Sequence, residues 1–447
     1  MFVDGVSKMF FHQDDIILLW DLITNFPKSL LGNASGHLIV FFRPIYLLEW
    51  YLFRLNFNFY LAVSIVLHFL TIYTAGKIVY HLTQKKYWQT ITMLALVVNA
   101  NFYEVLWMPS SQMMSISTLF SLLATSLALK LFRQKSPTLQ NLLLLFILSI
   151  IPGLSWGTGL PIPAYLILAF GWLSKNKKIK LTKIIWPLLL SQLALLVVYI
   201  LSARSSSSEP STISNTFNII EIIKFVFFGI SYSIVGRYLF PFASRIFRFL
   251  AVGTVSVLLF NLKTLNTIKK FATQNTRFLV LCFLTLFGSY FLIALGRWQF
   301  GLGQAGAPRY AYLPMMFLVI FLATSLSKLK LNRNKKINLL LVVMIYSLLS
   351  LGAFTQVTAK WTERPQKNKV LFQYIQNMKP GECLQNDYIP WYIVETDKWT
   401  LKDIWPIFEK NFDPFTGDTN CTKINRDKPI PWSPVLPTPT LSQPTRL

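Results

Sequence analysis

The chain has 447 residues, of which 53% are hydrophobic, and its mean hydropathy is +0.47. This composition is too apolar for a water-soluble globule of that size and predicts a polytopic membrane protein. The formal net charge is +25, which in a soluble protein would indicate a nucleic-acid partner. Here the basic residues lie in short clusters between apolar runs, as in membrane loops, so no nucleic-acid partner is expected.

The first residues, MFVDGVSKMFFHQDD, have no basic segment followed by an apolar core, so they do not form a signal peptide. The stretch over 12–49 then stands out because it is neither a membrane span nor a basic loop. It contains Asp14, Asp15, Asp21 and Glu49, four of the eight acids that precede residue 357. A basic, apolar chain that concentrates its acids here is expected to use them.

A membrane-spanning helix needs about 20 mostly apolar residues. By this criterion the chain is an all-α polytopic membrane protein with about ten transmembrane helices. The predicted spans are 57–82, 88–107, 112–132, 139–156, 158–174, 184–202, 244–262, 277–297, 310–327 and 337–356. The fourth and fifth spans are short and are joined by PGLSWGTGLP, which predicts a tight helical hairpin.

The distribution of Lys and Arg predicts the orientation in the membrane. One set of alternate loops contains 19 basic residues and no acid, whereas the opposite set has only two basic residues, Arg204 and Arg309. Since cytoplasmic loops are rich in Lys and Arg, the first set faces the cytoplasm. Every acid before residue 357 is then on the outer side. Two further apolar segments, 38–56 and 221–240, carry charges and are expected to be helices at the outer interface.

This pattern divides the chain into four parts. Residues 1–56 form an outer acidic loop and a juxtamembrane helix, and residues 57–356 form the transmembrane domain. Residues 357–428 are expected to be a small soluble extracytoplasmic region, in which Cys383 and Cys421 either pair or remain free thiols. The segment 429–447 is rich in proline and is expected to be unfolded.

The pair Asp14-Asp15 is the first candidate for chemistry. Adjacent carboxylates near an apolar interface raise each other's pKa, which suits a general base near neutral pH. The same oxygens could bind a divalent cation, and no other cofactor is expected. The structural alternative is an acidic first turn of a helix, which is common.

Four further segments contain candidate binding residues. Arg43 precedes a proline at a helix start, where its planar guanidinium can bind phosphate; otherwise it is an interfacial arginine. Glu104 and Trp107 lie at the outer end of the second predicted span, where an acid is a functional candidate or an interfacial group beside an aromatic anchor. The loop RWQFGLGQAGAPRY contributes Arg297, Arg309 and Tyr310, which suit a phosphate or diphosphate group.

The order of these motifs resembles the polytopic GT-C glycosyltransferases, in particular their bacterial and protein O-mannosyltransferase-like branches. The resemblance covers about residues 10–320: an outer Asp-Asp loop, Arg-Pro at a juxtamembrane helix, Glu-Val-x-Trp at the next outer lip and a late Arg-Tyr. Such enzymes normally have a transmembrane helix before the acidic loop. This chain begins about a dozen residues before that loop. The resemblance therefore implies either that the first helix is missing or that the short acidic N-terminal segment crosses the membrane by itself.

The resemblance implies inverting transfer of a sugar from a polyprenyl-phosphate donor to a lipid, glycan or protein acceptor. The reaction would take place at the extracytoplasmic face of a multi-pass protein, as in a bacterial inner or plasma membrane. Asp14 or Asp15 would be the base, Glu104 the lip acid, and Arg43 or Arg309 would hold phosphate.

Other functions stay open on the sequence alone. A lipid-linked polysaccharide polymerase or ligase would also need outer arginines but has less use for the Asp-Asp loop. A non-enzymatic transporter of lipids or small molecules usually has ionisable residues near mid-membrane, where this chain has only His68.

Overall fold

The computed structural model describes residues 9–369 except 26, 32, 35–36, 55, 98, 134–135, 172–177, 206–217, 236–273, 328–331, 362–364 and 367. This part of the chain is built almost entirely of helices. Six of them are long and apolar enough to cross a membrane. They are α4 (Phe57–Thr83), α7 (Gln112–Arg133), α10 (Lys178–Ser205), α14 (Gln274–Arg297), α16 (Pro308–Leu326) and α17 (Arg333–Trp361). The protein is therefore an α-helical membrane protein.

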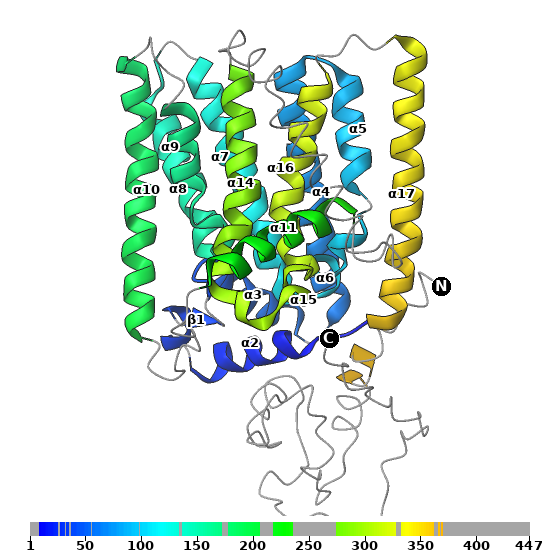
Figure 1. The fold of residues 1–447 in the computed structure, drawn as a ribbon. Helices are drawn as coiled ribbons and strands as arrows, with labels where there is room; N and C mark the ends of the chain where they lie inside the picture. Colours follow the sequence, from blue (N-terminus) through cyan, green and yellow to red (C-terminus); the bar gives the residue numbers. More distant parts are fainter. Residues whose placement is uncertain are drawn as a thin grey trace, which may run out of the picture.

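The long helices run side by side (Figure 1). The acids among the described residues lie towards one end of the bundle, on α2 (Gln13–Thr24), α3 (Phe42–Phe53), α6 (Tyr103–Trp107) and α11 (Ile219–Val235). The basic end of the bundle is formed by the C-terminal ends of α4, α7 and α16 and the N-terminal ends of α10, α14 and α17. The opposite, acidic end carries α2, α3 and α6. Lys85, Lys86 and Lys130, from two of the loops predicted to be basic, lie at the basic end.

Helix α16 is a central helix of the bundle. In its apolar window 67% of the residues are buried, against 17% in α17 and 28% in α10. Helix α16 packs along α14 and also contacts α4, α7 and α11. Because α16 begins at the acidic end, its first turn is enclosed by several other elements.

The predicted span over 88–107 is wrong as a continuous helix. Helix α5 (Lys86–Val97) ends after 12 residues, and the 3₁₀ turn η2 (Ala100–Phe102) and α6 follow it. Asn99 explains the interruption, since its side-chain oxygen accepts a hydrogen bond of 2.9 Å from the Asn101 N–H. This local bond competes with helical hydrogen bonding. The Asn99 amide also donates to the Tyr346 hydroxyl on α17 at 3.0 Å.

The short predicted hairpin is present. Helix α8 (Leu139–Ser155) and helix α9 (Ile162–Gly171) are shorter apolar helices joined by the 3₁₀ turn η4 (Gly157–Gly159). Gly159 is required there because an added Cβ would lie 2.4 Å from the Pro152 backbone. The predicted span over 244–262 and the expected parts over 370–447, with Cys383 and Cys421, lie outside the described residues.

Helix α11 covers most of the predicted interfacial segment 221–240, whose last five residues are not described. Figure 1 shows α11 running obliquely across the long helices, close to the acidic end. It packs against α14, α16 and the short helix α15 (Leu302–Ala305). The second predicted interfacial segment contains α3, which lies beneath α4 at the same end (Figure 1).

The N-terminal residues form a cap on the acidic end. Helix α2 is followed by the 3₁₀ turn η1 (Lys28–Leu31) and a two-stranded antiparallel hairpin of β1 (Asn33–Ala34) and β2 (His37–Leu38). Buried aromatic residues attach the cap to the bundle. The Phe11 ring meets the Phe57 and Tyr60 rings of α4 edge to face at centroid distances of 5.6 and 5.0 Å.

A buried polar contact joins α4 to α16 within the bundle. The Nδ1 atom of His68 and the hydroxyl of Tyr312 are hydrogen-bonded at 2.8 Å. The Phe102 ring lies against both, with centroid distances of 5.6 Å to His68 and 4.8 Å to Tyr312. This contact fixes the rotation of α16 about its axis, because it keeps the Tyr312 side of that helix facing His68 on α4. Tyr312 lies about one turn after the start of α16.

Substitution Tyr312→Phe is expected to lower the free energy of unfolding by about 1 kcal/mol, since one buried hydrogen bond is lost. Unfolding by SDS in mixed micelles, followed by circular dichroism, measures the change. The matched substitution Tyr73→Phe removes a hydroxyl from a residue of α4 that is 48% exposed. It should leave stability within about 0.5 kcal/mol of the parent. An equal loss in both variants would contradict the prediction.

Candidate functional site

The buried carboxylate of Asp15 joins the N-terminal cap to the bundle. Its Oδ2 accepts a hydrogen bond of 2.6 Å from the His12 N–H, which closes the first turn of α2. Its Oδ1 accepts a hydrogen bond of 2.7 Å from the Ser110 N–H in the 3₁₀ turn η3 (Pro109–Ser111), which leads into α7. Burial raises the pKa of Asp15 to about 7, while the bonds to Ser110 and His12 oppose that rise.

The neighbouring carboxylate differs in exposure. Asp14 is exposed, whereas Asp15 is fully buried. This difference follows from the helix, because adjacent residues lie about 100° apart around its axis. Asp14 can therefore meet a molecule from solvent, and both oxygens of Asp15 already hold backbone N–H groups.

A second acid at the same end pairs with an arginine. Oε2 of Glu104, in α6, accepts a hydrogen bond of 3.1 Å from the Arg309 N–H in the first turn of α16. The same oxygen lies 4.0 Å from Nη1 of Arg309. The carboxylate of Asp14 is also close enough to interact electrostatically with that guanidinium. The fold thus pairs Glu104 with Arg309 from two separate parts of the chain and places Asp14 within electrostatic range of that pair.

The exposures of this group suit a binding site. The side chain of Arg309 is 29% exposed, and that of Glu104 is 8% exposed. The guanidinium can therefore meet solvent while its carboxylate partner is largely shielded from it. We call Asp14, Glu104 and Arg309 the acid–arginine site.

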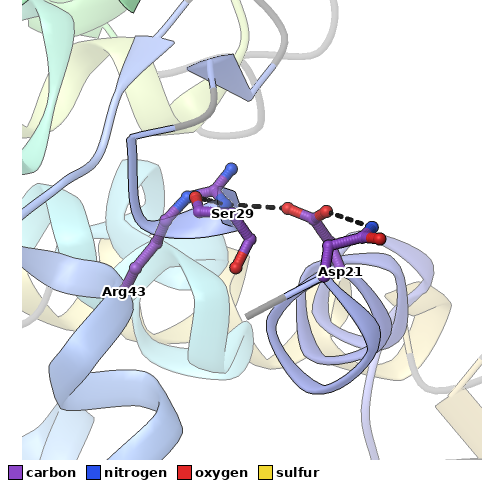
Figure 2. A network of polar contacts seen from close by, with 4 residues as sticks. Asp21, Ser29 and Arg43 are labelled. Atoms are coloured by element: carbon purple, nitrogen blue, oxygen red, sulfur yellow. Dashed lines mark hydrogen bonds and ion pairs between the residues drawn. The ribbon is translucent and has the colours of Figure 1, made fainter. Parts of the chain in front are cut away.

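Arg43 lies apart in a separate ion pair (Figure 2). Its side chain is only 2% exposed, and Nη1 lies 2.7 Å from Oδ2 of Asp21 and donates to the Ser29 carbonyl. Asn25 donates to the second Asp21 oxygen at 3.0 Å. The charge of Arg43 is thus neutralised inside the cap, where it joins α3 to α2 and η1. Of the three arginines considered for phosphate, Arg43 is buried, whereas Arg297 and Arg309 are partly exposed.

The remaining predicted residues are Trp107, Tyr310 and Arg297, and the contacts of each differ from the ion pair of Glu104 and Arg309. The indole N–H of Trp107 donates to the Thr358 hydroxyl of α17 at 3.0 Å, and the ring packs on Phe354. The Tyr310 hydroxyl accepts from the Gln304 amide at 3.3 Å, and the guanidinium of Arg309 lies 5.6 Å from the Tyr310 ring centroid. Arg297 lies 5.5 Å from the ring of Phe300 at the end of α14.

Glu49 is a buried acid whose role was not predicted from the sequence. It is 5% exposed on α3, its Oε2 has no hydrogen-bond partner, and burial raises its pKa to about 8. Glu49 and Asp15 both lie near the phenol of Tyr46. Burial raises the pKa of Tyr46, and the two carboxyl groups raise it further. The available signal was an acid inside the apolar helical segment over 42–53, which is costly unless the acid is neutral or paired.

The described residues contain no group of three His, Cys, Asp or Glu side chains that could hold a metal ion. A divalent cation at Asp14 and Asp15 would have to share oxygens that accept backbone hydrogen bonds at Asp15. Comparison with known proteins gives no match to a family model, a curated protein or a solved structure. The assignment of function therefore depends on the site itself.

The two raised carboxyl pKa values predict how stability depends on pH. Asp15 and Glu49 hold protons more tightly when folded than when unfolded, since their pKa values rise from 3.8 to about 7 and from 4.5 to about 8. The free energy of unfolding should therefore fall as pH rises from about 4 to 8. Glu49→Gln removes the contribution of Glu49 to this pH dependence. The free energy of unfolding of the variant should therefore fall less over this pH range than that of the parent.

Unfolding by SDS at pH 5 and pH 8 tests this expectation. Glu221→Gln is the matched control, because Glu221 pairs with Lys224 at the surface at 2.6 Å. That variant should keep the pH dependence of the parent. The same loss of stability between the two pH values in Glu49→Gln and in the parent would show that the carboxyl of Glu49 does not titrate in this window.

Proposed function

We propose that the protein is a membrane glycosyltransferase that moves a sugar from a polyprenyl-phosphate donor to an acceptor hydroxyl, with inversion at the anomeric carbon. The observation that carries the proposal is the acid–arginine site. Glu104 and Arg309 pair at the acidic end of a membrane bundle with Asp14 in electrostatic range, where a lipid-linked phosphate and a water-soluble acceptor group can meet.

The two charges of opposite sign match the requirements of this reaction. The acceptor oxygen attacks the anomeric carbon as a base removes its proton, and the bond from that carbon to the phosphate oxygen breaks. The phosphate leaves with the electron pair. A carboxylate near the acceptor serves as the base, and a guanidinium stabilises the charge that develops on the phosphate.

Within the Asp-Asp pair, we assign the role of base to Asp14. It is exposed, whereas Asp15 is buried and accepts two backbone hydrogen bonds. Asp15 then holds α2 against η3 and so keeps Asp14 within electrostatic range of Arg309. Arg309 binds the donor phosphate, because the side chain of Arg43 is only 2% exposed and is paired with Asp21.

We also propose the membrane arrangement that this function requires. The basic end faces the cytoplasm by the rule that cytoplasmic loops are rich in Lys and Arg. The acid–arginine site then lies at the extracytoplasmic face of a multi-pass protein in a bacterial inner or plasma membrane. The complete chain crosses the membrane about ten times when 244–262 and the shorter apolar helices are included.

One observation favours a transporter instead. Helix α5 is interrupted next to the buried pair of His68 and Tyr312, and transporters place discontinuous helices and ionisable residues at such positions. This alternative does not require an acid at the acidic end. Loss of function on substitution of Asp14 therefore distinguishes the two.

Substitution Asp14→Asn is expected to reduce sugar transfer roughly 100- to 10,000-fold, because the general base is lost. Transfer from a radiolabelled polyprenyl-phosphate sugar to endogenous acceptors in membrane vesicles measures the rate. Folding should be retained, since Asp14 is exposed. Asp15→Asn differs in that it should also lower the free energy of unfolding by about 1–3 kcal/mol, because Asn replaces one of two buried acceptor oxygens with a donor.

Glu221→Gln removes a carboxylate on α11 that is paired with Lys224 and should keep the full rate. Arg309→Ala should weaken binding of the donor more than binding of the acceptor, because the guanidinium binds phosphate. A full transfer rate in Asp14→Asn would contradict the assignment of the base.

Labelling of single cysteines tests the orientation. With the three natural cysteines replaced by alanine, Phe300→Cys places a thiol at a position that is 56% exposed near the acidic end. A membrane-impermeant maleimide added to intact cells should label it. Lys86→Cys, at the exposed start of α5, should react only after the membrane is opened. The reverse pattern would place the site in the cytoplasm.

A further inference from the structure

Before a ligand binds, the charges in the acid–arginine site do not favour the binding of an anion. Arg309 is the single cation of the group, and the carboxylates of Glu104 and Asp14 both interact with it. Glu104 also accepts the backbone N–H of Arg309 at 3.1 Å. A phosphate that approaches Arg309 therefore meets a guanidinium and an N–H that a carboxylate already occupies.

We infer that Glu104 is an exchangeable internal counter-ion of Arg309, which the phosphate of the donor displaces when it binds. The inference rests on the proposed function, because it assigns Arg309 to the donor phosphate. A carboxylate and the phosphodiester of the donor share the chemistry needed here, namely a negative charge with oxygens that accept from N–H groups. Glu104 therefore occupies the position that the donor phosphate takes up.

The geometry of the pair permits the exchange. The side-chain contact is long, at 4.0 Å between Oε2 of Glu104 and Nη1 of Arg309, so the carboxylate is held less tightly than one in a short ion pair and can be displaced by another anion. The partial exposure of Arg309 leaves an approach from solvent. In contrast, Nη1 of Arg43 lies 2.7 Å from Asp21 and its side chain is only 2% exposed, which allows no such approach.

The exchange has a consequence for selectivity. Glu104 opposes the binding of any anion at Arg309, so only a ligand with further binding energy displaces it. A polyprenyl phosphate gains that energy from burial of its apolar chain, whereas inorganic phosphate does not. Glu104 thus weakens the binding of both ligands at the guanidinium by the same factor, and only the lipid-linked phosphate has the further binding energy to remain bound.

The test is the affinity of the purified full-length protein, in detergent, for a short-chain polyprenyl phosphate and for inorganic phosphate. Isothermal titration calorimetry gives both dissociation constants. Glu104→Gln keeps the shape of the side chain but removes its charge. It should tighten the binding of both ligands roughly tenfold, as expected when a charged competitor for the same hydrogen bond is removed.

Three variants complete the experiment. Glu221→Gln removes an equal charge from the surface of α11 and should leave both constants unchanged. Arg309→Gln should weaken binding of both ligands, and Glu104→Gln combined with Arg309→Gln should show no gain over Arg309→Gln alone. If Glu104→Gln does not fold, Glu104→Asp takes its place. The shorter side chain withdraws the carboxylate from the Arg309 N–H, so phosphate binding should tighten by a smaller factor.

The outcomes separate this inference from the proposed function. Unchanged or weaker binding in Glu104→Gln, with weaker binding in Arg309→Gln, would overturn the role of Glu104 and leave Arg309 as the phosphate-binding residue. Unchanged binding in Arg309→Gln would overturn both the inference and the assignment of the donor site. Tighter binding of inorganic phosphate in Glu104→Gln but not in Glu221→Gln would support the exchange.

Discussion

The acidic end of the bundle depends on the two hydrogen bonds that the carboxylate of Asp15 accepts. One comes from the first turn of its own helix, and the other comes from Ser110, 95 residues later in the chain. Through the second bond the N-terminal cap is held on the turn that leads into α7. Glu104 lies shortly before that turn, so the same contact keeps the exposed Asp14 within electrostatic range of the pair of Glu104 and Arg309.

The cost of burying charge explains the other polar contacts at this end. Each buried charged group must be neutralised or hydrogen-bonded, because the bundle offers little water. Arg43 is paired with Asp21, and Glu104 is paired with Arg309. Glu49 has an oxygen without a partner, and burial raises its pKa so that the neutral acid is favoured near pH 7. Arg43 and Glu49 are thus buried groups with a structural role, whereas the partly exposed Arg309 can also meet a ligand.

The position of α16 relates the membrane bundle to the proposed chemistry. It is a buried, central helix that carries Arg309 in its first turn, and its rotation is fixed by the bond between Tyr312 and His68. A ligand bound at Arg309 therefore meets a rigid element, which is the usual requirement for a precise site. The short helix α5 also contacts α16. Helix α6, which follows α5 in the chain, contacts α16 as well and carries Glu104.

The sequence by itself determined the class of protein, the separation of basic and acidic ends and most of the long helices. These features depend on hydrophobicity and charge along the chain, which are local properties. It did not predict the break at Asn99, because the asparagine interrupts the helix through a single side-chain bond within an otherwise apolar run. Only the tertiary structure decided which acids and arginines meet. Asp14 and Asp15 are adjacent in sequence but differ in burial, and Arg43 and Arg309 look alike until their partners are known. Such pairings join residues that are 22 positions apart in Asp21 and Arg43 and 205 positions apart in Glu104 and Arg309, and no local pattern encodes them.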